Sequence, residues 1–159
     1  GKKIEQEQQV SAEDLFVSEV KNFVQEERLS QYILVLVDEQ KIRLILNDPI
    51  LFESGTDQLK KKSEAVLNGL LNLIQKVKNP MIIEGHTDDI PVKPGGKFRS
   101  NWDLAAARSA SVASFFVNDT GIKQERLVVN GFAHTQPIDS NDTPAGRAKN
   151  RRIEIIIKQ

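Results

Sequence analysis

The sequence predicts a layered α/β sandwich built on a mixed sheet. Two observations predict this fold class. Segments with apolar residues at helical spacing alternate with short runs of β-forming residues, in the order helix, hairpin, helix, strand, helix, strand, short helix, strand. The chain also has 159 residues, 39% of them hydrophobic, which suits one buried core and excludes a low-complexity linker.

The composition excludes several classes of protein. Basic and acidic residues number 22 each, so we do not expect binding to nucleic acid through overall positive charge. The chain has no Cys, which excludes disulfides, thiolate metal sites and Cys nucleophiles. No run approaches the ~20 apolar residues of a membrane-spanning helix. Because the chain starts at Gly1 rather than Met, we expect an excised fragment, with room for a membrane segment upstream.

The first 30 residues predict a polar lead-in followed by an amphipathic helix. Residues 1 to about 10 are rich in Gln and Glu, so we expect a mobile segment. Ser11-Ala12-Glu13-Asp14 resembles a capping box and marks the start of a helix that extends to about Leu29. The helical stripe consists of Ala12, Leu15, Phe16, Val20, Phe23 and Val24.

A β-hairpin follows this helix. Residues 32–37 form a continuous apolar run, and residues 42–46 alternate after the polar residues 38–40. Asn47-Asp48-Pro49 breaks the second strand, because Pro cannot donate a hydrogen bond to a central ladder. We therefore predict an irregular connection over residues 50–55.

Two further helices and three further strands complete the prediction. Apolar spacing between Leu59 and Val77 predicts a helix, and four Pro or Gly residues within residues 90–96 predict a loop. Ser100-Asn101 can cap the next helix, which Gly121 is placed to end. The predicted strands are residues 81–85, 127–130 and 153–157, and Thr143-Pro144 can start a short helix before the last of them.

The residue types for metal binding are present but incomplete. His86, Asp88 and Asp89 could suggest a metal site, because imidazole and carboxylate groups bind Zn and Mn. The other His is His134, and no helical His pair occurs. We therefore predict no metal and no cofactor, and interpret His86 as a residue at a strand end that hydrogen-bonds the backbone.

The patterns expected of an enzyme are also missing. No Ser lies in a Gly-x-Ser-x-Gly turn, which argues against a nucleophilic Ser. Asp88, Asp89 and Asp103 could form a carboxylate pair, but surface Asp residues are common enough to produce such sets by chance. We predict that the chain is not an enzyme.

A basic segment near the C-terminus is the strongest local charge bias. It contains Arg147, Lys149, Arg151 and Arg152. The segment is either a solvated turn or the binding site of a phosphate or carboxylate. Nucleic acid is not expected as a partner, because only Phe132 offers an aromatic ring nearby.

Asp88 and Arg108 form a more informative pair. Asp88 follows a predicted strand and Arg108 lies inside the next helix, so a crossover could place them on opposite walls of one groove. Asn101 starts that helix, whose free N–H groups add partial positive charge. Such a groove complements a zwitterion, with Asp88 for an ammonium and Arg108 for a carboxylate. The spacing alone allows equally that the two residues pair only with each other.

Three motifs resemble, in order, those of OmpA-like peptidoglycan-binding domains. They are Gly85-His86-Thr87-Asp88, then Asn101-x-x-Leu104-x-x-x-Arg108, then Gly146-Arg147-Ala148-x-Asn150-Arg151-Arg152-x-Glu154. They cover about residues 50–159. The resemblance implies a two-layer sandwich with helices packed on one face of the mixed sheet. It also implies a groove that grips the diaminopimelate of the peptidoglycan stem peptide without cleaving it.

The resemblance implies roles for individual residues as well. Asp88 would take the amine and Arg108 the carboxylate of diaminopimelate. The residues that would line or support the pocket are Thr87, Asn101, Leu104 and Arg151.

Within this superfamily, the chain is similar to the B subunit of the flagellar motor stator, MotB and its sodium-driven relatives such as MotS. The matching stretches are residues 85–92, residues 100–104 and Leu51-Phe52-x-x-Gly55-x-x-x-Leu59. In that family a transmembrane helix carrying the ion-binding Asp precedes an extracytoplasmic part, which dimerises and anchors the stator to the cell wall. The similarity implies a tethered extracytoplasmic location, a homodimer, and the stator A subunit as a partner.

The same similarity implies a division of the chain. Residues 1–30 would be a linker with an amphipathic helix, and residues 31–159 the peptidoglycan-binding domain. Within the linker, residues 11–29 would correspond to the region whose rearrangement switches the stator on. The alternative is an envelope-anchoring domain of an outer-membrane porin or a Pal-type lipoprotein, since these share the pocket motifs. They usually have a shorter segment between Asp88 and Asn101 and lack the Asn-Trp-Asp/Glu-Leu run. No residue assigns the driving ion, proton or sodium.

Overall fold

The computed structural model describes residues 10–118 and 121–159. The predicted mobile lead-in thus lies almost wholly outside the described residues. The helices are α2 (Ala12–Glu26), α3 (Asp48–Leu51), α4 (Lys61–Ile74), α5 (Asn101–Val117) and α6 (Pro144–Asn150), with a 3-10 turn, η1 (Gln124–Arg126). The strands are β1 (Ile33–Val37), β2 (Lys41–Asn47), β3 (Met81–His86), β4 (Leu127–Gly131) and β5 (Arg152–Lys158).

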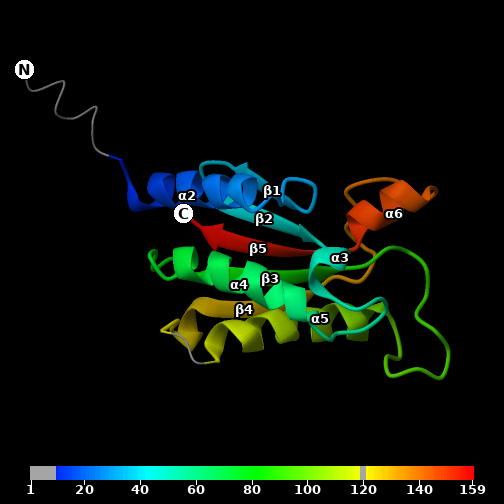
Figure 1. Cartoon of the computed structure of the whole chain (residues 1–159). Helices are drawn as coiled ribbons and strands as arrows, with labels where there is room; N and C mark the ends of the chain where they lie inside the picture. Colours follow the sequence, from blue (N-terminus) through cyan, green and yellow to red (C-terminus); the bar gives the residue numbers. More distant parts are fainter. Residues whose placement is uncertain (1–9, 119–120) are drawn as a thin grey trace, which may run out of the picture.

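The strands form one mixed sheet, as predicted. Their order is β1-β2-β5-β3-β4, with β3 and β4 parallel and the other neighbours antiparallel (Figure 1). The parallel pair is joined through α5, because parallel strands need a crossover connection. The resulting α/β sandwich places the end of β3 beside the start of α5.

The N-terminal helix is part of the hydrophobic core. Its predicted cap is confirmed, since Ser11 Oγ accepts a hydrogen bond from Asp14 N at 3.0 Å. Phe16, Val20 and Val24 are buried in the same cluster as residues of α4 and the sheet. The ring of Phe23 lies against Gly69 of α4, where any Cβ would overlap the ring. The division into a linker and a domain at residue 30 stays a prediction.

The predicted hairpin is confirmed and its turn is held by one side chain. β1 and β2 pair in antiparallel register, with Ile33 opposite Leu46. Asp38 Oδ1 accepts hydrogen bonds from the backbone N–H groups of Gln40 at 2.8 Å and Lys41 at 2.9 Å. These bonds lower the pKa of the Asp38 carboxyl below its usual range, and the bond from Gln40 has the largest effect.

The core lies between the sheet and the helices packed on it. Alternate residues of the central strands point into it, as the period of two in a strand requires. These residues include Ile42, Leu44, Leu46, Ile83, Ile153, Ile155 and Ile157, and from α4 Leu67, Leu70 and Ile74. Among the helices formed by the described residues, none combines the length and apolar character needed to cross a membrane.

Two predicted element ends are wrong. The irregular connection predicted over residues 50–55 is wrong at its start, since Ile50 and Leu51 belong to the short helix α3. Pro49 is tolerated in the first turn of this helix, where its missing N–H has no intrahelical partner. Helix α5 ends at Val117 with Asn118 extended, so Gly121 does not end it. The start of α6 is as predicted, with Thr143 Oγ1 accepting from Gly146 N at 3.0 Å.

Candidate functional site

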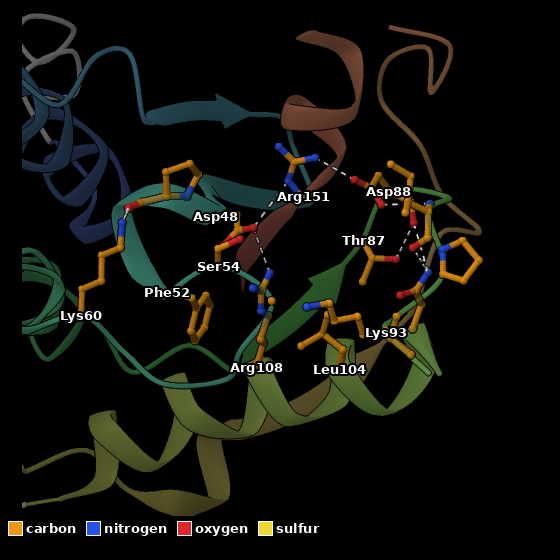
Figure 2. A pocket seen from close by; sticks show the side chains of 16 residues that line it. Asp48, Phe52, Ser54, Lys60, Thr87, Asp88, Lys93, Leu104, Arg108 and Arg151 are labelled. Carbon is orange, nitrogen blue, oxygen red and sulfur yellow. Dashed lines mark hydrogen bonds and ion pairs between the residues drawn. The ribbon is translucent and has the colours of Figure 1, made fainter. Parts of the chain in front are cut away.

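A pocket opens where β3 ends and α5 begins. Its volume is about 590 Å³. It is walled by the segment after β3, the first turns of α5, the α3 region and Arg151 before β5 (Figure 2). All the site residues predicted from the sequence lie in its lining, namely Asp88, Arg108, Thr87, Asn101, Leu104 and Arg151.

The wall after β3 is fixed by backbone hydrogen bonds. Thr87 N donates to Ala133 O at 2.8 Å, and Asp88 Oδ1 accepts from Ile90 N at 3.0 Å. Asn101 Nδ2 donates to the carbonyl oxygens of Asp88 at 3.4 Å and Ile90 at 3.0 Å, which ties the start of α5 to this wall. Asp88 is therefore held in place rather than carried on a free loop.

Close packing brings α5 against the end of β3. A Cβ on Gly85 would overlap the backbone carbonyl oxygen of Ala105, so no larger residue fits there without moving the helix. Asn101, Leu104 and Arg108 follow at intervals of three and four residues, which places them on one face of α5. This explains why three residues from the motif line one pocket.

Arg108 is buried and its guanidinium is fixed from three sides. Its Nε donates to the carbonyl oxygen of Thr56 at 2.7 Å, and its Nη1 lies 3.1 Å from Asp48 Oδ2. Its Cζ lies 4.8 Å from the centroid of the Phe52 ring, within the range of a cation–π contact. The side chain is thus preorganised at the pocket wall.

Asp88 pairs with Arg151 rather than with Arg108. Arg151 Nη1 lies 2.7 Å from Asp88 Oδ2, and Arg151 Nε lies 3.6 Å from Asp48 Oδ2 (Figure 2). The charges therefore alternate along the wall in the order Arg108, Asp48, Arg151, Asp88. The alternative that Asp88 and Arg108 pair only with each other is wrong, because each has a different partner.

Asp48 was missed by the sequence analysis. Its sequence position predicts only a break after β2, whereas its side chain is over nine-tenths buried and contacts both arginines of the pocket. A carboxylate directly before Pro49 is typical of a turn, so the local sequence carried no signal for this role. Only the fold brings Asp48 to Arg108 and Arg151.

His86 is the last residue of β3, but its predicted backbone hydrogen bond is wrong. Its Nε2 lies 3.2 Å from Glu84 Oε1 and 3.8 Å from Glu154 Oε2, and its ring stacks on Phe132 at 5.2 Å between centroids. Asp88 lines the pocket and Asp89 is exposed, so the metal set considered from the sequence does not assemble.

Glu84, His86 and Glu154 do lie close enough together to hold a metal ion. However, Glu154 already accepts from Arg43 Nη2 at 2.7 Å and from Arg152 Nε at 2.7 Å. The two carboxylates and the two guanidiniums balance, so a divalent ion would add uncompensated buried charge. We therefore interpret this group, together with both arginines, as a structural ion-pair network, called the sheet network below.

The sheet network shifts the pKa values of its members. Burial is the largest influence on Glu154 and raises its pKa, but the hydrogen bonds from Arg43 and Arg152 outweigh it and leave the pKa below its usual value. Burial lowers the pKa of Arg152, against the opposing influence of Glu154. The ionised pair is thus stabilised mainly by direct hydrogen bonds.

The basic segment near the C-terminus is distributed over several places. Arg147 Nη1 donates to Asn141 O at 2.9 Å, and Lys149 Nζ lies 3.4 Å from Asp139 Oδ2. Arg151 lines the pocket, whereas Arg152 belongs to the sheet network. The segment therefore does not act as one patch for an anionic partner.

The carboxylates considered for catalysis do not converge either. Arg99 Nε lies 3.0 Å from Asp103 Oδ2, and this side-chain hydrogen bond lowers the pKa of the Asp103 carboxyl. Asp103 is not part of the pocket lining, and Asp89 is exposed. Asp88 is thus separated in the fold from the groups it would need for carboxylate-pair chemistry.

The fold and the pocket define an α/β domain whose pocket is lined by alternating positive and negative side chains. Residues 51–151 match the OmpA family, and the chain belongs to that family. OmpA-like domains are non-catalytic, which confirms the prediction that this chain is not an enzyme.

Curated relatives narrow the similarity further. The uncharacterized protein YtxE of Bacillus subtilis is 30% identical over 151 residues, which cover 95% of this chain and 62% of the relative. Motility protein B of the same organism is 29% identical over 143 residues, or 88% of this chain and 54% of the relative. The peptidoglycan-binding protein ArfA of Mycobacterium tuberculosis is 30% identical over 75% of this chain and 35% of its own length. The chain thus spans less than two thirds of each of these relatives.

Solved structures agree with this similarity. A putative MotB-like protein from Desulfovibrio vulgaris has a TM-score of 0.84 and 28% identity, covering 91% of this chain and 92% of that one. The periplasmic domain of Helicobacter pylori MotB has a TM-score of 0.75 and 27% identity, covering 83% and 82%. The chain is therefore MotB-like in both sequence and fold.

Proposed function

We propose that this domain binds peptidoglycan non-covalently and anchors a flagellar motor stator unit to the cell wall. It does so by gripping the diaminopimelate residue of the stem peptide. The observation that carries the proposal is the pocket itself, whose lining includes both Asp88 and Arg108, each paired with a different residue. A zwitterionic head group complements such a lining.

Each wall has a definite chemical task. Asp88 accepts hydrogen bonds from the ligand's ammonium, and Arg108 donates two to its carboxylate, with the N-terminus of α5 adding partial positive charge. Each charge-assisted bond contributes about 1.5 to 3 kcal/mol when partly desolvated. Thr87, Asn101 and Leu104 shape the walls.

The relatives support the choice of ligand and of assembly. ArfA carries peptidoglycan binding in its name, and motility protein B matches 88% of this chain. That extent favours a stator subunit over a porin or a Pal-type lipoprotein. The domain then lies outside the cytoplasmic membrane, follows a transmembrane segment that contacts the stator A subunit, and pairs with a second copy.

Dimerisation would compensate for a weak single pocket. One stem peptide makes few contacts, so we expect low affinity for a single site. Two linked pockets raise the effective concentration of wall near the second site, which strengthens attachment without new contacts.

Sedimentation with purified sacculi tests the proposal. The intact protein should sediment with sacculi, whereas Asp88→Ala and Arg108→Ala should each stay in the supernatant. Far-UV circular dichroism should be unchanged in both variants, because the substitutions remove binding to sacculi and leave the secondary structure intact. Arg99→Ala is the matched control, since Arg99 is exposed and does not line the pocket. Retention of both pocket variants on sacculi would contradict the proposal.

A further inference from the structure

One arginine of the pocket is shared between two carboxylates. Arg151 Nη1 lies 2.7 Å from Asp88 Oδ2, while its Nε lies 3.6 Å from Asp48 Oδ2. The first distance is a strong charge-assisted hydrogen bond, and the second is too long for one. The Arg151 side chain is 35% exposed, whereas those of Asp48 and Asp88 are 9% and 10% exposed. Arg151 is therefore the partner with freedom to move.

Asp48 is fixed and has an unused acceptor. Its N–H donates to Arg151 O at 2.9 Å and its carbonyl accepts from Phe52 N at 3.0 Å, which holds it at the start of α3. Its Oδ2 lies 3.1 Å from Arg108, but its Oδ1 is buried with no hydrogen-bond partner among the described residues. An unsatisfied buried carboxylate oxygen is costly, so a group that can donate to it is favoured there.

The present contacts conflict with the proposed binding mode. Asp88 Oδ2 is engaged by Arg151 and Asp88 Oδ1 accepts from Ile90 N at 3.0 Å. An ammonium that approaches Asp88 therefore meets a guanidinium already in place, and two like charges at one carboxylate repel. Tight recognition requires that Arg151 moves to another acceptor.

We propose that Asp48 is this acceptor, and that it thereby determines the pocket's specificity for zwitterions. This inference rests on the proposed function. When the ligand's ammonium binds Asp88, Arg151 turns to Asp48, shortens its 3.6 Å contact and donates to the buried Oδ1. Asp48 is a positioning residue, since it acts on the ligand through Arg151.

The charges of the four residues agree with this role. Asp48 and Asp88 balance Arg108 and Arg151, so a ligand with no net charge leaves the charge of the pocket balanced. Without the charge of Asp48, Arg151 stays on Asp88 and one positive charge is left over. Such a pocket still binds a carboxylate, but an ammonium group on the ligand no longer increases its affinity.

Titrations with meso-diaminopimelate and with two ligands that each lack one kind of its charged groups test the inference. These two are pimelate, which lacks the amines, and cadaverine, which lacks the carboxylates. The intact protein should prefer meso-diaminopimelate to pimelate by about tenfold or more, the effect of one charge-assisted hydrogen bond. Asp48→Asn should lose most of this preference by weakening diaminopimelate binding, with pimelate binding equal or tighter. Asp142→Asn, an exposed control outside the pocket, should keep it.

A rescue separates this role from a merely structural one. Adding Arg151→Gln to Asp48→Asn removes the competitor for Asp88 and should restore most of the preference for diaminopimelate. Arg151→Gln alone should bind cadaverine more tightly than the intact protein does. If Asp48→Asn fails to fold, Arg151→Gln alone still tests the inference. Weaker cadaverine binding by Arg151→Gln than by the intact protein would overturn it.

The remaining outcomes are distinct. If the intact protein binds neither sacculi nor diaminopimelate, the proposed function fails and the inference with it. If the intact protein binds both, and Asp48→Asn keeps its preference or the double variant is not rescued, only the inference is wrong.

Discussion

Two charged groups of this domain, the sheet network and the pocket, differ in how their carboxylate oxygens are used. In the sheet network Glu154 pairs with Arg43 and Arg152, and His86 lies near both Glu84 and Glu154. In the pocket Asp48 and Asp88 pair with Arg108 and Arg151. In the sheet network both oxygens of Glu154 accept short hydrogen bonds. In the pocket, one oxygen of Asp48 has no partner among the described residues, and one ion pair is long.

This difference separates structural charge from functional charge. A buried carboxylate whose two oxygens both accept from fixed guanidiniums, as in Glu154, holds the sheet together and has no oxygen free for a ligand. A network with an unpaired carboxylate oxygen beside a cavity can still accept a hydrogen bond when a ligand binds.

The largest effect should come from breaking the sheet network. Glu154→Gln leaves two guanidiniums without their shared carboxylate in a buried site, which should cost about 3 to 5 kcal/mol of unfolding free energy. Urea unfolding measures this loss. Glu125→Gln, on an exposed turn, is the control and should change stability by less than about 0.5 kcal/mol. A loss of under about 1 kcal/mol for Glu154→Gln would mean that the network contributes little.

Breaking the pocket should change binding more than stability. Arg108→Lys keeps the positive charge but lacks the planar pair of donors, so retention on sacculi should fall about tenfold or more. Co-sedimentation over a range of sacculus concentrations measures this fall. Arg99→Lys should be retained like the intact protein. Full retention of Arg108→Lys would show that charge alone, without two-pronged geometry, suffices.

The smallest effect concerns the pH dependence of the unfolding free energy, and it tests the sheet network. The pKa of Glu154 is lowered in the folded protein, so its ionised form stabilises the fold above the usual glutamate pKa. This contribution is lost as pH falls through the lowered folded-state value. Urea unfolding between neutral and acidic pH should therefore show a steeper loss of stability for the intact protein than for Glu154→Gln. Parallel curves would exclude Glu154 as a source of the acid dependence.

The sequence was sufficient where a function depends on local order. Asp88 follows a strand, and Asn101, Leu104 and Arg108 share one face of a helix, so their convergence could be predicted from spacing and from family motifs. Ser11 and Thr143 were likewise predictable, because an N-cap depends on the next three residues.

The sequence was insufficient where partners meet only through the fold. Asp48 contacts Arg108 and Arg151 across long stretches of chain, and its position before Pro49 suggested a turn and no more. For His86 a local signal was available, since Glu84 lies two residues earlier on the same strand face. Glu154, however, faces Glu84 only through the register of β3 and β5.

Competition on the cell wall tests the central claim most directly. Sacculi carrying the bound protein are washed with free meso-diaminopimelate or with pimelate at equal concentrations, and the released protein is measured. Release by meso-diaminopimelate well beyond that by pimelate is the expected result, because only the former offers an amine to Asp88. Equal release by both, or release by neither, would contradict recognition of a zwitterion by this pocket.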